Sequence, residues 1–552
     1  MELLSIDGEL LTRMIVSAAN SLESNKIAVN SLNVFPVPDG DTGTNMSMTM
    51  SAAVKEMKSA NASTPEDIAE AVANGSLMGA RGNSGVILSQ LFRGFAKGIK
   101  ENKELNCKNL ALALKEGANT AYKAVMKPTE GTILTVARET ADKAIELSKN
   151  IQDVPTLMNQ VFDYANVVLD KTPDMLPVLK KAGVVDAGGK GLIYIYKGMV
   201  DVINGKEVEY SETVDELIQD KGVSVGHTSE ETDIKYGYCT EFIVKSKDAD
   251  IDKFRDYLST IGDSLIVVGS SDIIKVHFHT NEPGVALTSA LELGELVKVK
   301  VDNMREQHRT LLNEKEMHME EPAVEEEEKQ AGLITVAMGE GIRDVFMDLG
   351  ADEVIEGGQT MNPSTEDILH AIKKVNASDI YILPNNGNIL LAAKQAASMS
   401  EKNVIVIPTK SIPQGIAALT VFNPDSSSDE NEEIMVSTIN YVKTGQVTYA
   451  VRNTTYDDKE INEGNILGLV DGKINNTGKD INDVTESLIM DMVSEDDELI
   501  TIFYGNDIEK EDVDKLLENV HEKFPDCDIQ SHNGGQPLYY YIISVEWFIV
   551  SI

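Results

Sequence analysis

Apolar residues in the first 205 positions recur at spacings of three and four, which predicts one helix after another. The pattern is clear before and after a glycine-containing segment at 40–43. Its apolar positions are Leu10, Leu11, Met14, Ile15, Ala18 and Leu22, then Met46, Met50, Ala53, Val54 and Met57. Asp7 stands where a helix cap is expected. Residues 1–205 are therefore predicted to form a helical bundle.

The pattern changes after residue 205. Residues 206–235 are acidic and weakly periodic, which predicts a connection. Strand-like runs at 238–244 and 273–279 flank a helix-like stretch at 251–261. We therefore expect a small α+β domain within 206–318. The acidic run at 319–330 has no aromatic residue and is predicted to be a linker.

From residue 331 onward, short apolar runs alternate with helical patterns, which predicts a C-terminal α/β domain over 331–552 with a mostly parallel sheet. The strand candidates lie at 333–336, 380–383 and 404–407. Residues 333–342 resemble residues 499–508, and Gly-Gly-Gln follows each copy, at 357–359 and 534–536. Two related α/β lobes would explain this repeat, and chance similarity between apolar strands is the alternative.

Composition limits the possible partners. The net charge of −41 would repel nucleic acid, so we expect no nucleic-acid partner. It would also repel ATP, so a nucleotide site would need metal ions and backbone N–H groups. Three distant cysteines fit a reducing compartment rather than a disulfide framework. Without a long apolar run or a basic leader, we predict a cytoplasmic protein with no signal peptide or transmembrane segment.

Two glycine-containing segments in the helical part carry candidate chemistry. Asp39 and Asp41 flank Gly40, so their carboxylates can converge on a hard cation such as Mg²⁺. A capped turn is the alternative. Residues 79–86 read Gly-Ala-Arg-Gly-Asn-Ser-Gly-Val, in which small residues let backbone N–H groups approach a phosphate. The alternative here is a plain turn between helices.

A third segment, 183–191, nearly spells a phosphate-binding loop of the Walker A type. Its lysine comes one place late, no Ser or Thr follows, and no strand precedes it. We therefore reject that interpretation.

The middle domain contains a candidate zinc site. His277 and His279 alternate on a predicted strand, so both rings point to one face, and Cys239 lies on another predicted strand. Thiolate and imidazole together suit Zn²⁺, with His308 as a possible fourth ligand. The alternative is a half-buried cysteine with two surface histidines.

Several motifs in order carry a resemblance to known families. Pro-Asp-Gly-Asp-Thr-Gly-Thr-Asn at 38–45, the motif at 79–85, Gly-Thr-Ile-Leu at 131–134 and Val-Asp-Ala-Gly-Gly-Lys-Gly at 185–191 resemble the L subunit of dihydroxyacetone kinases (DhaL). Over its whole length the chain resembles the FakA subunit of bacterial fatty acid kinase. The further motifs lie at 236–241, 275–280, 303–309, 357–365 and 408–414.

The resemblance implies an eight-helix barrel that binds ATP through two Mg²⁺ ions. It implies transfer of the γ-phosphate to the carboxylate of a fatty acid held by a FakB-type carrier, which the C-terminal domain docks. Asp39 and Asp41 would be the catalytic metal ligands. The implied nucleotide contacts are Asn45, Gly82, Asn83, Ser84, Gly85, Thr132 and Asp186. Some DhaL subunits carry a third acid upstream, where this chain has only Asn33 or Val34.

Two other functions stay open at this point. One is a kinase for dihydroxyacetone or another small metabolite, which the extra 340 or so residues beyond the helical part disfavour. The other is a nucleotide-sensing adaptor that binds ATP without turnover. The sequence does not decide the acyl-chain preference or whether the chain forms a homodimer.

Overall fold

The structure is a computed structural model, and the chain divides into two units. One unit joins residues 1–211 to 328–552, and the other is residues 212–327. The residues that the structure describes are 3–33, 40–60, 62–100, 105–125, 127–206, 236–246, 251–270, 273–303, 328–358, 361–450, 453–456 and 459–547.

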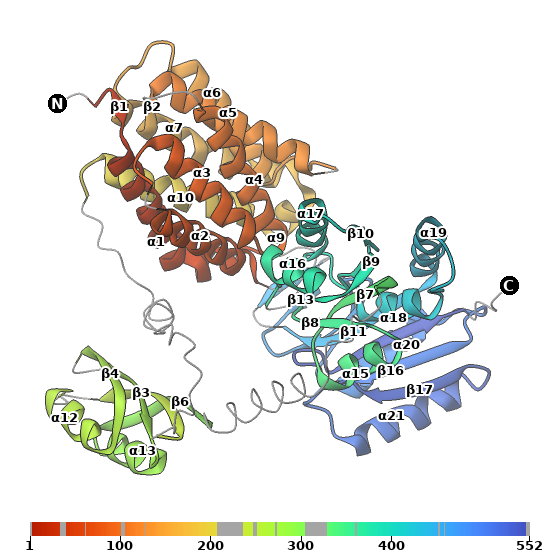
Figure 1. The fold of residues 1–552 in the computed structure, drawn as a ribbon. Coiled ribbons are helices and arrows are strands. Elements are labelled where there is room, and N and C mark those ends of the chain that lie inside the picture. The colour runs from red at the N-terminus through yellow and green to blue at the C-terminus, as the bar shows by residue number, and fades with distance from the viewer. Residues whose placement is uncertain are drawn as a thin grey trace. The chain divides into compact units, whose positions relative to one another are not determined.

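The described residues between 3 and 206 are mainly helical, as predicted (Figure 1). The helices are α1 (Gly8–Asn30), α2 (Thr42–Ser59), α3 (Pro65–Met78), α4 (Gly82–Ile99), α5 (Cys107–Ala124), α6 (Ile133–Leu147), α7 (Val154–Asp170), α8 (Thr172–Met175), α9 (Pro177–Ala182) and α10 (Ala187–Ile203). Strands β1 (Ser5–Ile6) and β2 (Leu105–Asn106) form a short antiparallel pair. Asp7 caps α1 by accepting from the Leu10 N–H at 2.8 Å, also as expected.

The helices share one apolar core, because each turns its apolar positions inward. From α1 to α7, each helix packs on the next along the chain, and α10 packs on both α1 and α7. Glycines allow some of these approaches. A Cβ at Gly198 on α10 would lie 2.4 Å from the backbone oxygen of Ser17 on α1. Close packing of this kind fixes how near α10 lies to α1.

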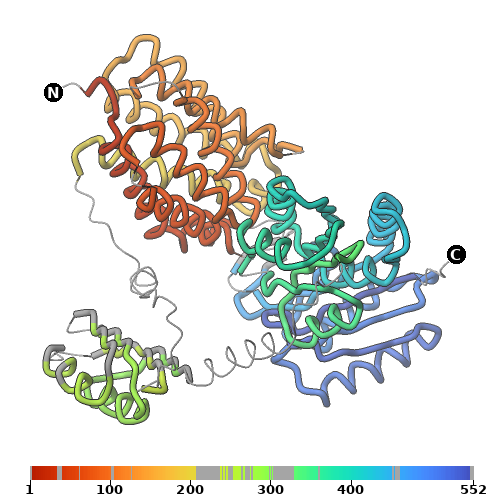
Figure 2. The backbone as a smooth tube through the Cα atoms, in the orientation of Figure 1, coloured from red at the N-terminus to blue at the C-terminus, as the bar shows by residue number. Residues whose placement is uncertain are grey.

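Residues 328–547 form the predicted α/β region, coloured green to blue in Figure 2. It contains two larger sheets. The first sheet is parallel throughout, with the order β10-β9-β7-β8. Its strands are β7 (Lys329–Ala337), β8 (Glu353–Glu356), β9 (Ala377–Leu383) and β10 (Asn403–Val406). Its helices are α15 (Glu340–Asp348), α16 (Thr365–Lys374), α17 (Leu390–Met399), α18 (Ile412–Thr420) and α19 (Ser428–Thr438), followed by the 3₁₀ turn η1 (Ile439–Tyr441).

The second sheet is mostly antiparallel, so the prediction of a mostly parallel sheet is wrong for this part of the chain. Its order is β15-β14-β11-β18-β16-β17, and only β16 and β17 run parallel. The strands are β11 (Lys443–Tyr449), β14 (Ile466–Val470), β15 (Lys473–Gly478), β16 (Leu499–Tyr504), β17 (Asp528–Asn533) and β18 (Tyr541–Glu546). Helices α20 (Ile481–Met492) and α21 (Lys510–Lys523) accompany them, with a hairpin of β12 (Thr454–Tyr456) and β13 (Lys459–Ile461).

A two-residue turn explains part of this difference. Asp471 and Gly472 both have positive φ, +48° and +78°, and join β14 to β15. An Asp-Gly pair with this backbone matches the twist of a tight antiparallel hairpin.

The two similar segments, 333–342 and 499–508, occupy different sheets. The first begins on β7 and leads through α15 to the parallel strand β8, and the second begins on β16 and leads through α21 to the parallel strand β17. The two sheets share one apolar core. A common origin for two lobes stays a prediction.

The described residues of the middle unit form an antiparallel sheet and two helices. The sheet order is β4-β5-β3-β6. Its elements are β3 (Tyr238–Ser246), α12 (Ile251–Ile261), β4 (Gly262–Ser270), β5 (Ile273–Thr280), α13 (Pro283–Leu291) and β6 (Gly294–Asn303). Phe242, Phe254 and Phe278 lie in its core. In the parts of the chain that the structure describes, no helix is long and apolar enough to cross a membrane.

Candidate functional site

The N-terminus of α2 holds a buried carboxylate. Gly40 has a φ of +61°, and Asp41 follows it at the N-cap position of α2. Asp41 is 6% exposed, and burial raises the pKa of its carboxyl. The amides of Asn33 and Asn362 donate to its two oxygens at 3.5 Å and 2.7 Å. Asp39, predicted with Asp41 as a metal ligand, lies outside the described residues.

The N-terminus of α4 packs against α2 because two glycines leave room. Gly82 has a φ of +56°, and a Cβ there would lie 2.6 Å from Nδ2 of Asn45. A Cβ at Gly85 would lie 2.4 Å from Oγ1 of Thr49. The structure thus brings Asn45, Gly82 and Gly85 together with Asp41. Ser84 is half-buried on the same first turn of α4.

The N-termini of α6 and α10 are joined by Asp186. Its carboxylate caps α10 by accepting from the Gly189 N–H at 2.7 Å and also accepts from the backbone N–H of Ile133, the first residue of α6. Burial raises the pKa of Asp186 to about 6. Thr132, at the N-cap of α6, donates its hydroxyl to the Thr129 carbonyl at 2.8 Å.

The two pairs of helix N-termini meet at one end of the helical region. A Cβ at Gly191, in the second turn of α10, would lie 2.6 Å from the sulfur of Met46, in the second turn of α2. The first turns of α2, α4, α6 and α10 therefore gather together. A helix N-terminus carries unpaired N–H groups and partial positive charge. Four of them can bind phosphates without a net positive chain.

The C-terminal α/β region contacts this same end. Arg81 donates to the carbonyl oxygen of Asn362 at 2.7 Å and pairs with Asp367 at 3.4 Å. The Thr365 N–H donates to the Ala80 carbonyl at 3.2 Å. Ala80 and Val86 join the apolar core of the parallel sheet, and α17 packs on α4 (Figure 1).

One predicted nucleotide contact has a partner in that region. The Asn83 amide donates to Oδ1 of Asn388 at 3.2 Å, so this side chain is held by the loop before α17. The residue that sequence reasoning missed is Asn362. The signal available was its position within the motif at 357–365, next to Pro363, but nothing in the motif itself pairs it with Asp41.

Among the described residues, no group of three or more His, Cys, Asp or Glu side chains could hold a metal ion. At Asp41 the donors fit a hard cation such as Mg²⁺, which prefers oxygen ligands. The carboxylate is buried, its described partners are amides and backbone, and the Asn362 Oδ1 beside it has no hydrogen-bond partner among the described residues. Asp41 would hold the ion.

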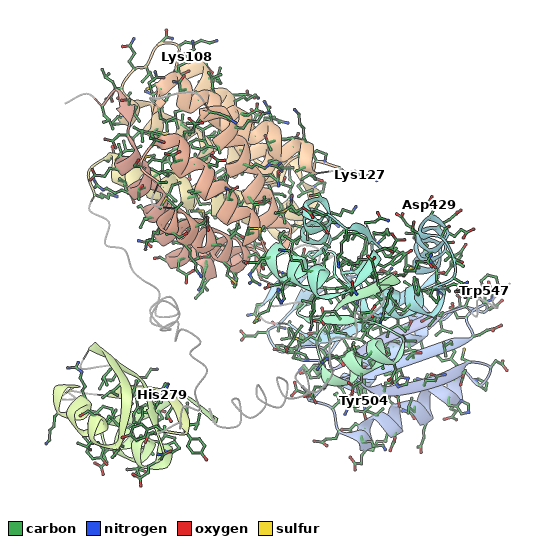
Figure 3. The ribbon with its side chains drawn as sticks, viewed as in Figure 1. Lys108, Lys127, His279, Asp429, Tyr504 and Trp547 are labelled. Atoms are coloured by element: carbon green, nitrogen blue, oxygen red, sulfur yellow. The ribbon has the colours of Figure 1, made fainter. Side chains whose placement is uncertain are left out.

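The predicted zinc ligands lie on paired strands. Cys239 on β3 is directly opposite His279 on β5, and Glu241 is opposite His277. Opposite residues of an antiparallel pair share a face, so these four positions line one face of the sheet. Figure 3 labels His279, which is half-buried. The side chains of Cys239 and His277, and all of His308, lie outside the described residues.

A helical region that gathers four helix N-termini around a buried carboxylate has the features of a phosphate-binding domain, the class to which nucleotide-dependent phosphotransferases belong. The comparisons with known proteins agree. Residues 36–201 match the DAK2 domain, residues 235–311 match the FakA-like middle domain of fatty acid kinase, and residues 332–546 match the FakA-like C-terminal domain of the same enzyme.

Relatives cover the whole chain. It is 46% identical to protein YloV of Bacillus subtilis, over 99% of this chain and 100% of that one. It is also 46% identical to an uncharacterised protein of Staphylococcus aureus strain USA300, over 98% and 99% of the two chains. The chain belongs to the FakA family of fatty acid kinase subunits, and its kinase-type DAK2 domain implies nucleotide binding.

Among solved structures, one similarity is to the Streptococcus pneumoniae fatty acid kinase B3 protein loaded with linoleic acid. It has 11% identity and a TM-score of 0.28, and it covers 40% of this chain and 100% of that one. A similarity this low carries no weight for fold or function.

Proposed function

We propose that this chain is the ATP-binding, catalytic subunit of a fatty acid kinase. It transfers the γ-phosphate of ATP to the carboxylate of a fatty acid bound to a separate FakB-type carrier protein, which gives an acyl phosphate. The observation that carries this proposal is the gathering of four helix N-termini around buried Asp41 in a chain of the FakA family.

The chemistry asks little of the protein beyond positioning. The acceptor is already an anion, so no general base is needed, and rate acceleration comes from alignment and neutralisation of charge. Mg²⁺ ions would supply positive charge that neutralises the phosphates. Asp41 and Asp39 would hold them. The backbone N–H groups of the Gly82–Gly85 turn and the Asn45 amide orient the nucleotide, and Thr132 and Asp186 contact it from the N-termini of α6 and α10.

The remaining two domains have separate proposed roles. We infer that residues 331–552 dock the carrier, because this region matches the FakA-like C-terminal domain and contacts the first turn of α4. Cys239, His277 and His279 form a separate zinc site in the middle unit, supported by the pairing of β3 with β5.

The test is a reconstituted assay with ATP, a fatty acid and a FakB-type carrier. We expect ADP release and acyl phosphate only when all three are present. Asp41→Asn should lower the rate by about 10²–10³ or more, because it removes charge that holds the ions. The control is Asp7→Asn, since Asn caps a helix as well as Asp and Asp7 caps α1.

Three outcomes would contradict the proposal. Near-normal activity of Asp41→Asn would remove the metal-site assignment. ATP binding without turnover in the complete mixture would indicate an adaptor. Phosphorylation of dihydroxyacetone in place of the fatty acid would indicate a small-metabolite kinase.

A further inference from the structure

Asn362 belongs to the α/β region and contacts the end of the helical region where the first turns of α2, α4, α6 and α10 gather. It lies between β8 and α16 and is 1% exposed. Its Nδ2 donates to Oδ2 of Asp41 at 2.7 Å and lies 3.4 Å from Oδ1 of Asn45. The nitrogen must be the atom that faces Asp41, because an amide oxygen at that distance from a carboxylate oxygen would be repelled.

The backbone around Asn362 is fixed from both sides. The Arg81 guanidinium donates to its carbonyl oxygen at 2.7 Å, and Pro363 restricts Asn362 to extended backbone. Two residues further on, Ser364 and Asp367 close a capping box that begins α16. These contacts fix the position of the Asn362 amide next to Asp41.

The contact between Asn362 and Asp41 leaves one negative charge without a paired cation, and one hydrogen-bond acceptor without a partner, among the described residues. Within the described ranges, the groups that stabilise the Asp41 carboxylate are amides and backbone, and no cation pairs with it. Oδ1 of Asn362 is buried and has no hydrogen-bond partner among the described residues. Buried acceptors without partners are unfavourable, so such an arrangement favours a ligand that supplies positive charge and donors. A hydrated Mg²⁺ ion supplies both, since Mg²⁺ usually keeps several of its waters.

We propose that Asn362 is a positioning residue of the nucleotide-binding metal site, so that the C-terminal α/β region completes a site otherwise built by the helical region. Its Nδ2 orients the Asp41 carboxylate for the ion, and its Oδ1 accepts from a donor in the occupied site. The identity of the reaction rests on the proposed function, but the metal-positioning role does not depend on which substrate receives the phosphate.

The test uses the full chain and Mn²⁺, a paramagnetic ion that takes oxygen ligands as Mg²⁺ does. Binding of Mn²⁺ with a non-hydrolysable ATP analogue is measured by electron paramagnetic resonance, without carrier or fatty acid. Asn362→Ala should weaken Mn²⁺ binding by about 10–100-fold, because groups that orient a metal ligand typically contribute that much. Asn362→Leu, which keeps most of the volume and removes both polar atoms, should do the same if the alanine variant folds poorly.

The matched control is Gln395→Ala. Its Oε1 accepts from the Gln90 amide at 3.0 Å, so this change removes one hydrogen bond from the same contact between α17 and α4 without approaching Asp41. Its Mn²⁺ affinity should equal that of the wild type. In the kinase assay, Asn362→Ala should raise the Mg²⁺ concentration needed for half-maximal rate, and Gln395→Ala should not.

Unchanged or tighter Mn²⁺ binding in the Asn362 variants would overturn the inference, and tighter binding would show that Asn362 blocks the site instead. An equal loss in Gln395→Ala would also overturn it, because loss of docking alone would then explain the effect. The proposed function fails separately, if wild-type protein binds Mn²⁺ and nucleotide but makes no acyl phosphate with the carrier present.

Discussion

Gly82→Ala tests whether the first turn of α4 must lie against Asn45 for the site to work. Gly82 has a φ of +56°, and its added Cβ would lie 2.6 Å from Nδ2 of Asn45 and 3.4 Å from Nδ2 of Asn362. The first distance is about 0.8 Å shorter than the 3.4 Å at which ordinary contact begins. Asn45 must therefore move, or the α4 turn must.

Two costs follow, and they can be separated. A non-glycine residue in the left-handed region costs about 1–2 kcal/mol of folding free energy. Gly205, after the end of α10, has a φ of +80°, and a Cβ there would have no atom within 4 Å. Gly205→Ala therefore carries the backbone cost alone. Gly82→Ala adds a displacement in the site, and a misplacement of about 1 Å can lower a rate by about 10²-fold.

The assay combines urea unfolding with the carrier-dependent kinase rate for both variants. We expect Gly82→Ala to lose at least as much unfolding free energy as Gly205→Ala, and a rate loss of about 10²-fold only in Gly82→Ala. Wild-type activity of Gly82→Ala would refute the reasoning, because Asn45 and the α4 turn would then tolerate displacement. Equal rate losses in both variants would attribute the effect to backbone strain or instability.

Two further predictions concern Asp186 and the middle unit. The pKa of Asp186 is raised from 3.8 to about 6, so its contribution to stability is fully present below pH 3.8 and is lost as the pH rises through 6. Between these pH values the melting temperature of Asp186→Asn should therefore fall less than that of the wild type. Identical slopes of melting temperature against pH would contradict this prediction. Elemental analysis should find about one zinc per chain, and less zinc in Cys239→Ala. Cys107→Ala is the control, because Cys107 lies in the helical core, and its zinc content should not fall. Zinc-free wild-type protein would contradict the zinc prediction.

The helical part was predictable because its apolar spacing is long and regular. Leu11, Met14 and Leu22 are 2%, 1% and 0% exposed, as a buried stripe on α1 requires. Asp7 was equally visible, since a helix cap depends on a few neighbouring residues. The glycines at 82 and 85 were visible as small residues, but their close approach to α2 was not predicted. Local chemistry of this kind is recorded in the sequence itself.

Strand direction was not predictable in the same way. A short apolar run such as 499–502 is compatible with a parallel or an antiparallel neighbour, because its periodicity says that the strand is buried and not how it pairs. The Asp-Gly pair at 471–472 did contain the information for one hairpin. The other antiparallel pairings join strands that are distant in sequence, including β11 with β18.

The contact between Asn362 and Asp41 was the hardest feature to predict from the sequence. It is separated from Asp41 by 321 positions, and its burial exists only once the α/β region packs on α4. Before docking, a polar residue beside a proline in a loop predicts a turn and nothing more. Candidate site residues within one region could be proposed from the sequence, and the residue that joins the second region could not.

The charge of the chain explains why such a residue would be useful. With a net charge of −41, a triphosphate is repelled by the protein as a whole and by Asp41 in particular. The helix N-termini supply partial positive charge, and Arg81, one cation beside the site, is already paired with Asp367. Under the proposed function, bound cations would supply the remaining neutralisation, and their affinity would depend on how well Asp41 is oriented. If the carrier docks on the α/β region that holds Asn362, its binding and the geometry of the metal site would be linked through the contacts between that region and α4, including the Asn362 amide.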